Sequence, residues 1–197
     1  MLQEFNFTEN ITLSTHQEVI MYFDKLERNL IDIIKEEQAK LGFFEEDIRL
    51  YYPLSSLNHF FDSTDNAEEM QERLEHFPEG FTDRLGDIRV THKGDRFCFH
   101  IPPKGTVFVH ENTAPNEFIR QLVELVGRHG CTMNEIENLF HTYSENILCE
   151  DMNNGEFDRL IRFLDKPEDP YYYCFKDEGC HIIYHRFLPA DYADFDF

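Results

Sequence analysis

The chain has 197 residues, of which 41% are hydrophobic and 15% aromatic, which is enough for one good-sized domain or two small ones with a phenylalanine-rich core. Its net charge is −21, from 39 acidic and 18 basic residues, and such a field disfavours nucleic acid phosphates and anionic lipid as partners. No stretch approaches the roughly 18 consecutive apolar residues of a membrane span, and the N-terminus has no basic start or apolar run typical of a signal peptide. We therefore expect a cytoplasmic protein that does not bind membranes and whose five cysteines are reduced thiols.

The charge is distributed unevenly along the chain. Residues 1–82 hold 6 basic and 18 acidic side chains, and residues 131–197 hold 5 and 15. Residues 83–130 between them hold 7 basic and 6 acidic side chains. A near-neutral middle therefore lies between two acidic flanks.

The first third of the chain has helical patterns. Residues 5–13 alternate weakly and indicate a short strand or an ordered arm, after which Ser14 or Thr15 caps a long helix that ends near Gly42. Pro53 is expected to open a short helix, and Asp65 or Asn66 to cap another that stops at Pro78.

The middle of the chain changes to a period of two. Apolar residues alternate with polar ones around Val90, from Phe97 to Ile101, and from Val107 to Val109. The interruptions Lys93-Gly94-Asp95 and Pro102-Pro103-Lys104-Gly105 are typical of turns. This pattern predicts a central antiparallel β-meander of three strands.

The last third predicts three helices and a hairpin. Pro115 opens the first helix, the capping box of Thr132 and Glu135 opens the second, and an amphipathic run from Phe157 to Leu164 predicts the third. Residues 171–188 are rich in aromatic and β-branched side chains and are split by Asp177-Glu178-Gly179, which indicates a hairpin. The predicted fold class is α+β, with segments 1–112 (helices and β-meander) and 113–197 packed as one globular unit.

Two resemblances follow from these residues. The order of helices and hairpin over residues 115–188 resembles a winged helix, although the helix that would enter the major groove carries Arg159 and Arg162 among Glu156, Asp158 and Asp165. Direct binding of DNA by this segment is therefore disfavoured. The ending Tyr184-His185-Arg186-Phe187, followed by Asp191-Tyr192, resembles an uncharacterised bacterial family known as a domain of unknown function. This resemblance implies no activity and no functional residues.

The near-neutral middle contains the best candidates for a ligand site. Arg89, His92, Lys93 and Arg96 cluster near the predicted turn at Gly94 and could attract an anionic ligand or an acidic partner. A turn at Gly105 would place His100 opposite His110. The alternative is that these basic groups pair with carboxylates of the acidic flanks.

The final hairpin contains two further candidates. A metal site is suggested by four possible ligands, with Cys174 across from His181: Cys174, Cys180, His181 and His185. However, His181 and His185 would lie roughly 13 Å apart along a strand, which is too far for both to bind one ion. We therefore expect structural cysteines and no metal. His185 and Arg186 could form an anion or acid–base site. Alternatively, Arg186 pairs with a carboxylate of its own fold, for which Asp191 is a candidate.

Common catalytic and cofactor-binding motifs are absent from the sequence, which has no G-x-S-x-G, Walker A, G-x-G-x-x-G, H-E-x-x-H or C-x-x-C motif. We therefore expect no cofactor, and a non-catalytic protein–protein interaction module of a bacterial type is the leading hypothesis. The alternatives are a DNA mimic that inhibits a DNA-binding protein, and a small-molecule-binding domain or enzyme that uses His100, His110 or His185.

Overall fold

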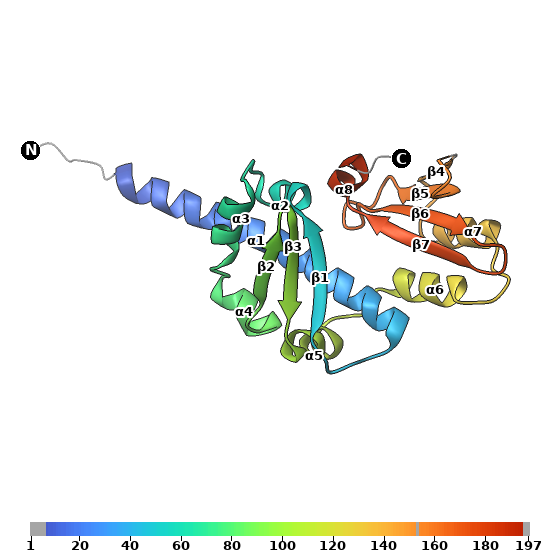
Figure 1. Ribbon diagram of the computed structural model, residues 1–197, viewed down its shortest axis with the longest axis horizontal. Coiled ribbons are helices and arrows are strands. Elements are labelled where there is room, and N and C mark those ends of the chain that lie inside the picture. Colours follow the sequence, from blue (N-terminus) through green and yellow to red (C-terminus); the bar gives the residue numbers. More distant parts are fainter. Residues whose placement is uncertain (1–6, 153, 195–197) are drawn as a thin grey trace, which may run out of the picture. The chain divides into compact units, whose positions relative to one another are not determined.

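The computed structural model describes residues 7–152 and 154–194 and shows an α+β protein with two antiparallel sheets, which confirms the predicted class (Figure 1). The elements, in chain order, are α1 (Phe7–Leu41), β1 (Ile48–Pro53), α2 (Leu54–Phe61), α3 (Ala67–Leu74), α4 (Glu79–Leu85), β2 (Arg89–Lys93), β3 (Arg96–Ile101), α5 (Pro103–Asn112), α6 (Glu117–Val126), α7 (Met133–Tyr143), β4 (Ile147–Asp151), β5 (Arg159–Phe163), β6 (Tyr172–Asp177), β7 (Ile182–Phe187) and α8 (Pro189–Asp194). None of the helices in this described part of the chain has the length and apolar character needed to cross a bilayer.

The chain forms two compact units. Unit 1 comprises the described residues of 1–35 and 44–113, and unit 2 comprises those of 36–43 and 114–197. Helix α1 therefore contributes residues to both units, because its final turns from Glu36 onward belong to unit 2.

Helix α1 is longer than the sequence pattern predicts. It begins at Phe7, so the strand or arm expected over residues 5–13 is wrong from residue 7 onward, and Phe5 lies outside the described residues. The segment from residue 7 to 14 contains no Pro or Gly, so nothing in it interrupts the helix.

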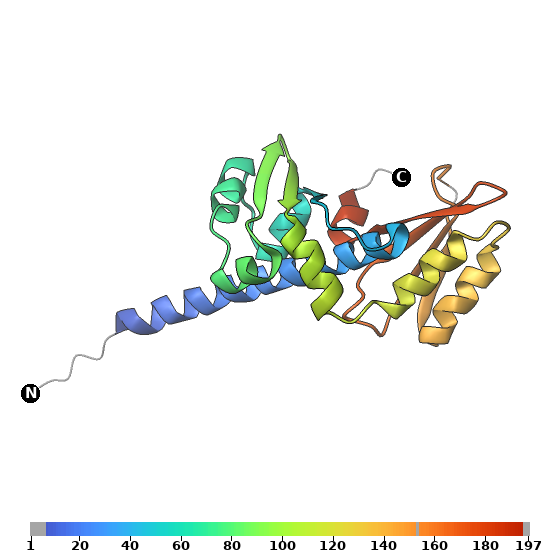
Figure 2. The same ribbon diagram turned by 90° about the horizontal axis from the view of Figure 1, so that it is seen from below.

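Unit 1 is built on a three-stranded sheet in the order β1-β3-β2. Both views show α1 along one face of this sheet (Figures 1 and 2). Phe97, Phe99 and Ile101 of β3 are fully buried on that inner face. The hydroxyl of Tyr52 in β1 donates a 2.6 Å hydrogen bond to Asn29 Oδ1 of α1. The inner face of the sheet and α1 therefore form the core of unit 1.

The central meander is only partly as predicted. Strands β2 and β3 and their turn at Gly94 are confirmed, but the strand expected at Val107–Val109 is wrong, because these residues lie in α5. Pro103 occupies the first helical position, where its fixed φ and missing N–H suit a helix start. The third strand is β1, which pairs with β3 from the other side.

Unit 2 is built on a second antiparallel sheet in the order β4-β5-β6-β7. The ring of Phe140 in α7 lies 4.8–5.1 Å from the rings of Phe118 in α6, Phe163 in β5 and Tyr173 in β6. Helices α6 and α7 therefore cover one face of the sheet with an aromatic core. The predicted capping box of Thr132 at the start of α7 and the predicted β6–β7 hairpin are both confirmed.

The winged-helix interpretation is wrong, because its third helix does not form. Residues 159–163 form strand β5, which is buried on both faces. Leu160 contacts Phe157 and Cys174 on one face, whereas Phe163 packs on α6 and α7 on the other. A strand covered on both sides needs a nearly continuous apolar run, which the sequence cannot distinguish from a helical stripe.

A buried ion pair joins the end of α1 to β7 within unit 2. Arg186 Nη2 lies 2.5 Å from Glu36 Oε2, and the two side chains are only 3% and 8% exposed. Tyr184 Oη donates a 2.8 Å hydrogen bond to Glu36 Oε1, and Lys40 Nζ lies 2.9 Å from the same oxygen. The guanidinium of Arg186 also lies over the ring of Tyr171, 4.1 Å from its centre. Burial acts to raise the pKa of Glu36, but the charges of Arg186 and Lys40 and the hydrogen bonds from Lys40 and Tyr184 outweigh it and lower the pKa.

The Glu36 carboxylate should be required for stability. Because its pKa is lowered in the folded state, its contribution is complete above the ordinary glutamate pKa of about 4.3 and is lost as the pH falls through the lowered value. Glu36→Gln should therefore reduce the free energy of unfolding at pH 7 by about 3–5 kcal/mol and weaken its dependence on acidic pH. Urea denaturation followed by circular dichroism at several pH values measures both effects. Glu37→Gln is the matched control, and equal stability of the two variants would contradict the role of Glu36.

Gly105 marks a close contact in unit 1. A Cβ there would lie 2.6 Å from Ile101 Cγ2 and 2.8 Å from the backbone oxygen of Leu85. Gly105→Ala should therefore lower the free energy of unfolding by about 1–3 kcal/mol, because a backbone atom cannot move away without disturbing the packing. Gly80→Ala in α4 is the control, since its nearest neighbour is the flexible end of Arg84 at 3.7 Å. A Gly105→Ala protein with an unchanged denaturation midpoint would contradict this packing.

Candidate functional site

The outer face of the unit 1 sheet is strongly basic. Side chains alternate along each strand, so the burial of the inner face points the other set away from α1. We call this set the basic face. It comprises Arg49 and Tyr51 of β1, Arg89, Thr91 and Lys93 of β2, and Arg96, Cys98 and His100 of β3.

Strand register arranges the basic face in three rows. The turn-side row, next to the β2–β3 turn, holds Arg96 and Lys93 beside Pro53. The middle row holds Tyr51, Cys98 and Thr91, and the far row holds Arg49, His100 and Arg89. Two basic rows therefore flank an uncharged row that contains an aromatic ring.

The cations of this face have no ion-pair partner among the residues that the structure describes. Arg49, Arg89, Lys93 and Arg96 are exposed, and none of them forms a salt bridge with any residue in the described part of the chain. Two other arginines of unit 1 do form salt bridges: Arg73 lies 2.7 Å from Asp65, and Arg84 lies 2.5 Å from Glu27. For these four side chains, the structure therefore does not show the alternative prediction, in which they pair with carboxylates of the acidic flanks.

The face is hollowed between its turn-side and middle rows. A hollow of about 380 Å³ is lined by Tyr51, Thr91, His92, Lys93, Arg96 and Cys98. Tyr51, in the middle row on the edge strand β1, is 60% exposed. The hollow thus offers two cations beside an open aromatic ring.

His100 responds to the charge of the far row. Its pKa is lowered by partial desolvation and then by the positive charges of Arg89 and Arg49, against a smaller opposite effect of Asp47. Its Nε2 also lies 3.4 Å from Thr91 Oγ1. His100 is therefore predominantly uncharged at pH 7, and the positive charge of the face comes from the four Arg and Lys side chains.

The structure separates two of the predicted histidines from this arrangement. His92 alternates to the other side of β2, where its ring stacks on Phe97 at 5.1 Å, although it borders the hollow. His110 lies in the last turn of α5 and is exposed, so the predicted position of His100 opposite His110 is wrong. The predicted third strand, which would have placed His110 opposite His100, is helix α5 in the structure.

In unit 2, His185 and Arg186 lie on opposite faces of β7. His185 is exposed, and its ring lies 5.7 Å from the ring of Phe157 and 6.0 Å from that of Phe187. Arg186 is buried on the other face against Glu36. The two side chains are therefore not combined in one site.

The cysteines and histidines of the final hairpin are also separated. Cys174 pairs across the strands with His185 rather than with His181 as predicted. Cys174 is buried, whereas Cys180 and His181 are exposed. Within the part of the chain that the structure describes, no three His, Cys, Asp or Glu side chains are grouped as metal ligands.

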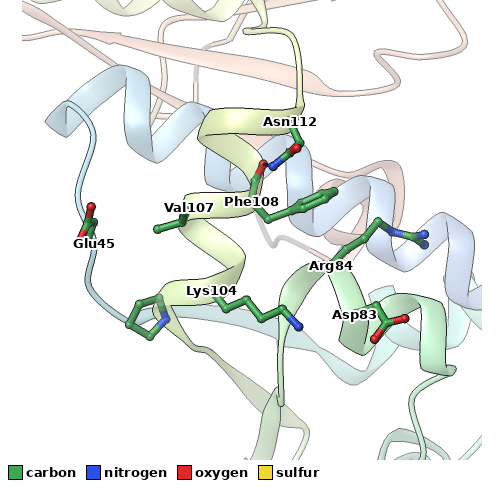
Figure 3. A pocket seen from close by; sticks show the side chains of 8 residues that line it. Glu45, Asp83, Arg84, Lys104, Val107, Phe108 and Asn112 are labelled. Carbon is green, nitrogen blue, oxygen red and sulfur yellow. Dashed lines mark hydrogen bonds between the residues drawn. The ribbon is translucent and has the colours of Figure 1, made fainter.

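A second hollow in unit 1 lies between α4, α5 and the segment before β1 (Figure 3). It has a volume of about 340 Å³, and Figure 3 shows Phe108 of α5 pointing across it toward Arg84 of α4. Its cations already have partners, because Arg84 pairs with Glu27 and Lys104 donates to the Thr82 carbonyl oxygen. This hollow is therefore a weaker candidate than the basic face.

Sequence reasoning missed Arg49 and Tyr51, because β1 was not recognised as a strand. The segment Ile48-Arg49-Leu50-Tyr51-Tyr52 does carry the relevant signal, since Leu50 and Tyr52 are buried while Arg49 and Tyr51 are exposed. This period of two was obscured by the aromatic character of Tyr51 and Tyr52.

Comparison with known proteins gives a family but no activity. Residues 23–195 match the family described as "Domain of unknown function, E. rectale Gene description (DUF3877)". The match covers most of the chain, which therefore belongs to this family, and the resemblance to a family of unknown function is confirmed. No curated protein and no solved structure matches the chain.

The pKa of His100 reports the charge of the basic face. Arg89→Gln should raise this pKa toward the ordinary value of about 6.5, because the main repulsive charge near the imidazole is removed. An NMR titration of the imidazole proton signals measures the shift. Arg73→Gln, which removes a cation paired with Asp65 elsewhere in unit 1, is the control. The same His100 pKa in both variants would contradict the proposed electrostatics.

Proposed function

We propose that this protein is a non-catalytic interaction module that binds an acidic partner protein through its basic face. The observation that carries the proposal is that four cations on one exposed sheet face form no salt bridge within the described residues, in a chain of net charge −21. Intramolecular carboxylates are abundant, yet Arg49, Arg89, Lys93 and Arg96 stay available for a partner. We also place this activity in the cytoplasm of a bacterium, where reduced cysteines would persist.

The arrangement of the face suits recognition of a protein. Arginine binds carboxylates through two parallel hydrogen bonds and is common in interfaces, as are exposed tyrosines. The middle row supplies Tyr51 as an aromatic contact between the two charged rows. A partner with carboxylates around an apolar side chain would match both features.

A catalytic use of the predicted histidines receives less support. In the described part of the chain, the hydrogen-bond neighbour of His100 is Thr91, and the ring of His185 packs against Phe157 and Phe187, so neither histidine is seen beside the carboxylate that would make it an acid–base pair. The four cations, in contrast, share one surface. Binding is therefore the function that this geometry supports best.

The proposal can be tested by charge reversal with a matched control. We expect the tagged protein to recover a reproducible acidic partner from its own cells, and Arg49→Glu/Arg89→Glu/Arg96→Glu to lose it, because reversed charges repel carboxylates. The control, Lys25→Glu/Arg28→Glu/Lys104→Glu, changes the net charge equally at positions outside the basic face and should retain the partner. Quantitative mass spectrometry of the recovered proteins compares the three samples. Equal recovery by both triple variants would contradict the proposal.

A further inference from the structure

We infer that the basic face recognises a short, extended peptide in which two acidic residues four positions apart flank a central aromatic residue. This inference rests on the proposed function and specifies the partner segment. It follows from the geometry of the three rows, from the carboxylates that border them, and from the position of Tyr51.

The row spacing fits an extended chain. Arg89 and Lys93 are four residues apart on β2, and Arg96 and His100 are four residues apart on β3. At 3.2–3.4 Å per residue, the two basic rows lie about 13 Å apart, with the middle row halfway. In an extended peptide, side chains at positions i, i+2 and i+4 project to the same side with the same spacing. Such a segment lying along the strands would place its first and last side chains over the two basic rows.

The middle row determines the central residue of that segment. Tyr51 is open to solvent, and its neighbours Cys98 and Thr91 carry no charge. A carboxylate placed over this row would have no cation directly beneath it, whereas an aromatic ring would gain contact with the ring of Tyr51. The favoured pattern is therefore acidic–any–aromatic–any–acidic.

Carboxylates limit the length of the segment at both ends. Asp95 lies in the turn beyond Lys93 and Arg96, while Asp47 and Asp87 lie just before β1 and β2, beyond the far row. All three are exposed. A longer acidic chain would run from the basic face onto these negative groups, so about five residues span the favourable surface.

The same argument disfavours a nucleic acid strand. Such a strand carries a phosphate at every nucleotide, so phosphates would fall over the uncharged middle row and over the bordering aspartates. The net charge of −21 repels a long polyanion further. A segment with only two charged positions avoids both penalties.

Peptides of identical composition and different spacing test the inference. The probe is a fluorescein-labelled peptide with the core Glu-Ser-Phe-Ser-Glu between Gly-Ser flanks, and its isomer has the core Glu-Phe-Glu-Ser-Ser. Fluorescence anisotropy with the full chain should give about tenfold tighter binding of the first peptide, since only its carboxylates reach both basic rows. Replacing the central Phe by Ser should weaken binding because the contact with Tyr51 is lost.

Protein variants locate the contacts. Arg49→Gln/Arg89→Gln removes the charge of the far row, and Lys93→Gln/Arg96→Gln removes that of the turn-side row. Either variant should bind the first peptide about tenfold more weakly and should no longer prefer it over its isomer, because a single basic row cannot sense spacing. Lys25→Gln/Arg28→Gln should keep both the affinity and the preference.

Three results would overturn the inference. One is equal affinity of the wild-type protein for the two isomers, and another is an unchanged preference after loss of one row. The third is tighter binding of a single-stranded oligothymidylate than of either peptide. If the spacing preference is absent while partner recovery still depends on the basic face, the proposed function stands and only the peptide pattern is wrong. Loss of both would remove the proposed function as well.

Discussion

Burial of the inner face of sheet β1-β3-β2 is the constraint on which the rest of unit 1 depends. Phe97, Phe99 and Ile101 are fully excluded from water, so β3 cannot shift by one residue without exposing them and burying Arg96 and His100 instead. Burying a charged arginine would cost several kcal/mol unless a partner charge accompanied it. The apolar core therefore fixes the register of all three strands, and the register fixes the three rows of the basic face. The candidate binding surface is thus a consequence of how the core packs.

Local signals in the sequence were sufficient for elements whose partners are close in the chain. The β2–β3 hairpin follows from alternation around Lys93-Gly94-Asp95, and for that reason Arg89, Lys93 and Arg96 were predicted as neighbours, together with His92. Strand β1 was missed because it pairs with a strand more than 40 residues away, and only that pairing distinguishes it from the aromatic segment around it. Helix α5 was misread because two valines at alternate positions imitate a strand. Its local helix signal is Pro103 at the first helical position, and Gly105 allows the helix to approach the Leu85 backbone closely.

In unit 2 the sequence was misleading for a related physical reason. Strand β5 is covered on both faces, so Leu160, Ile161 and Phe163 are all buried, and its two polar residues, Arg159 and Arg162, do not alternate with them in a period of two. The Glu36–Arg186 pair could not be predicted, because 150 positions separate its partners and several carboxylates are nearer in sequence. The sequence does place Arg186 in a segment rich in tyrosines. In the structure its buried guanidinium lies over the ring of Tyr171 and pairs with Glu36.

The contrast between the two kinds of arginine in this protein bears on specificity. Arg84 and Arg186 are paired with Glu27 and Glu36, and in these positions they stabilise packing. Arginines on the basic face are held on strands whose outward positions contain no carboxylate, so the backbone itself keeps them apart from the many acidic residues of the chain. The charges around the face have the opposite sign, and at physiological ionic strength they act over roughly 8 Å. A short acidic ligand centred on the rows is then attracted, whereas one that extends beyond them meets repulsion, and this difference discriminates among anionic partners better than a uniformly basic surface would.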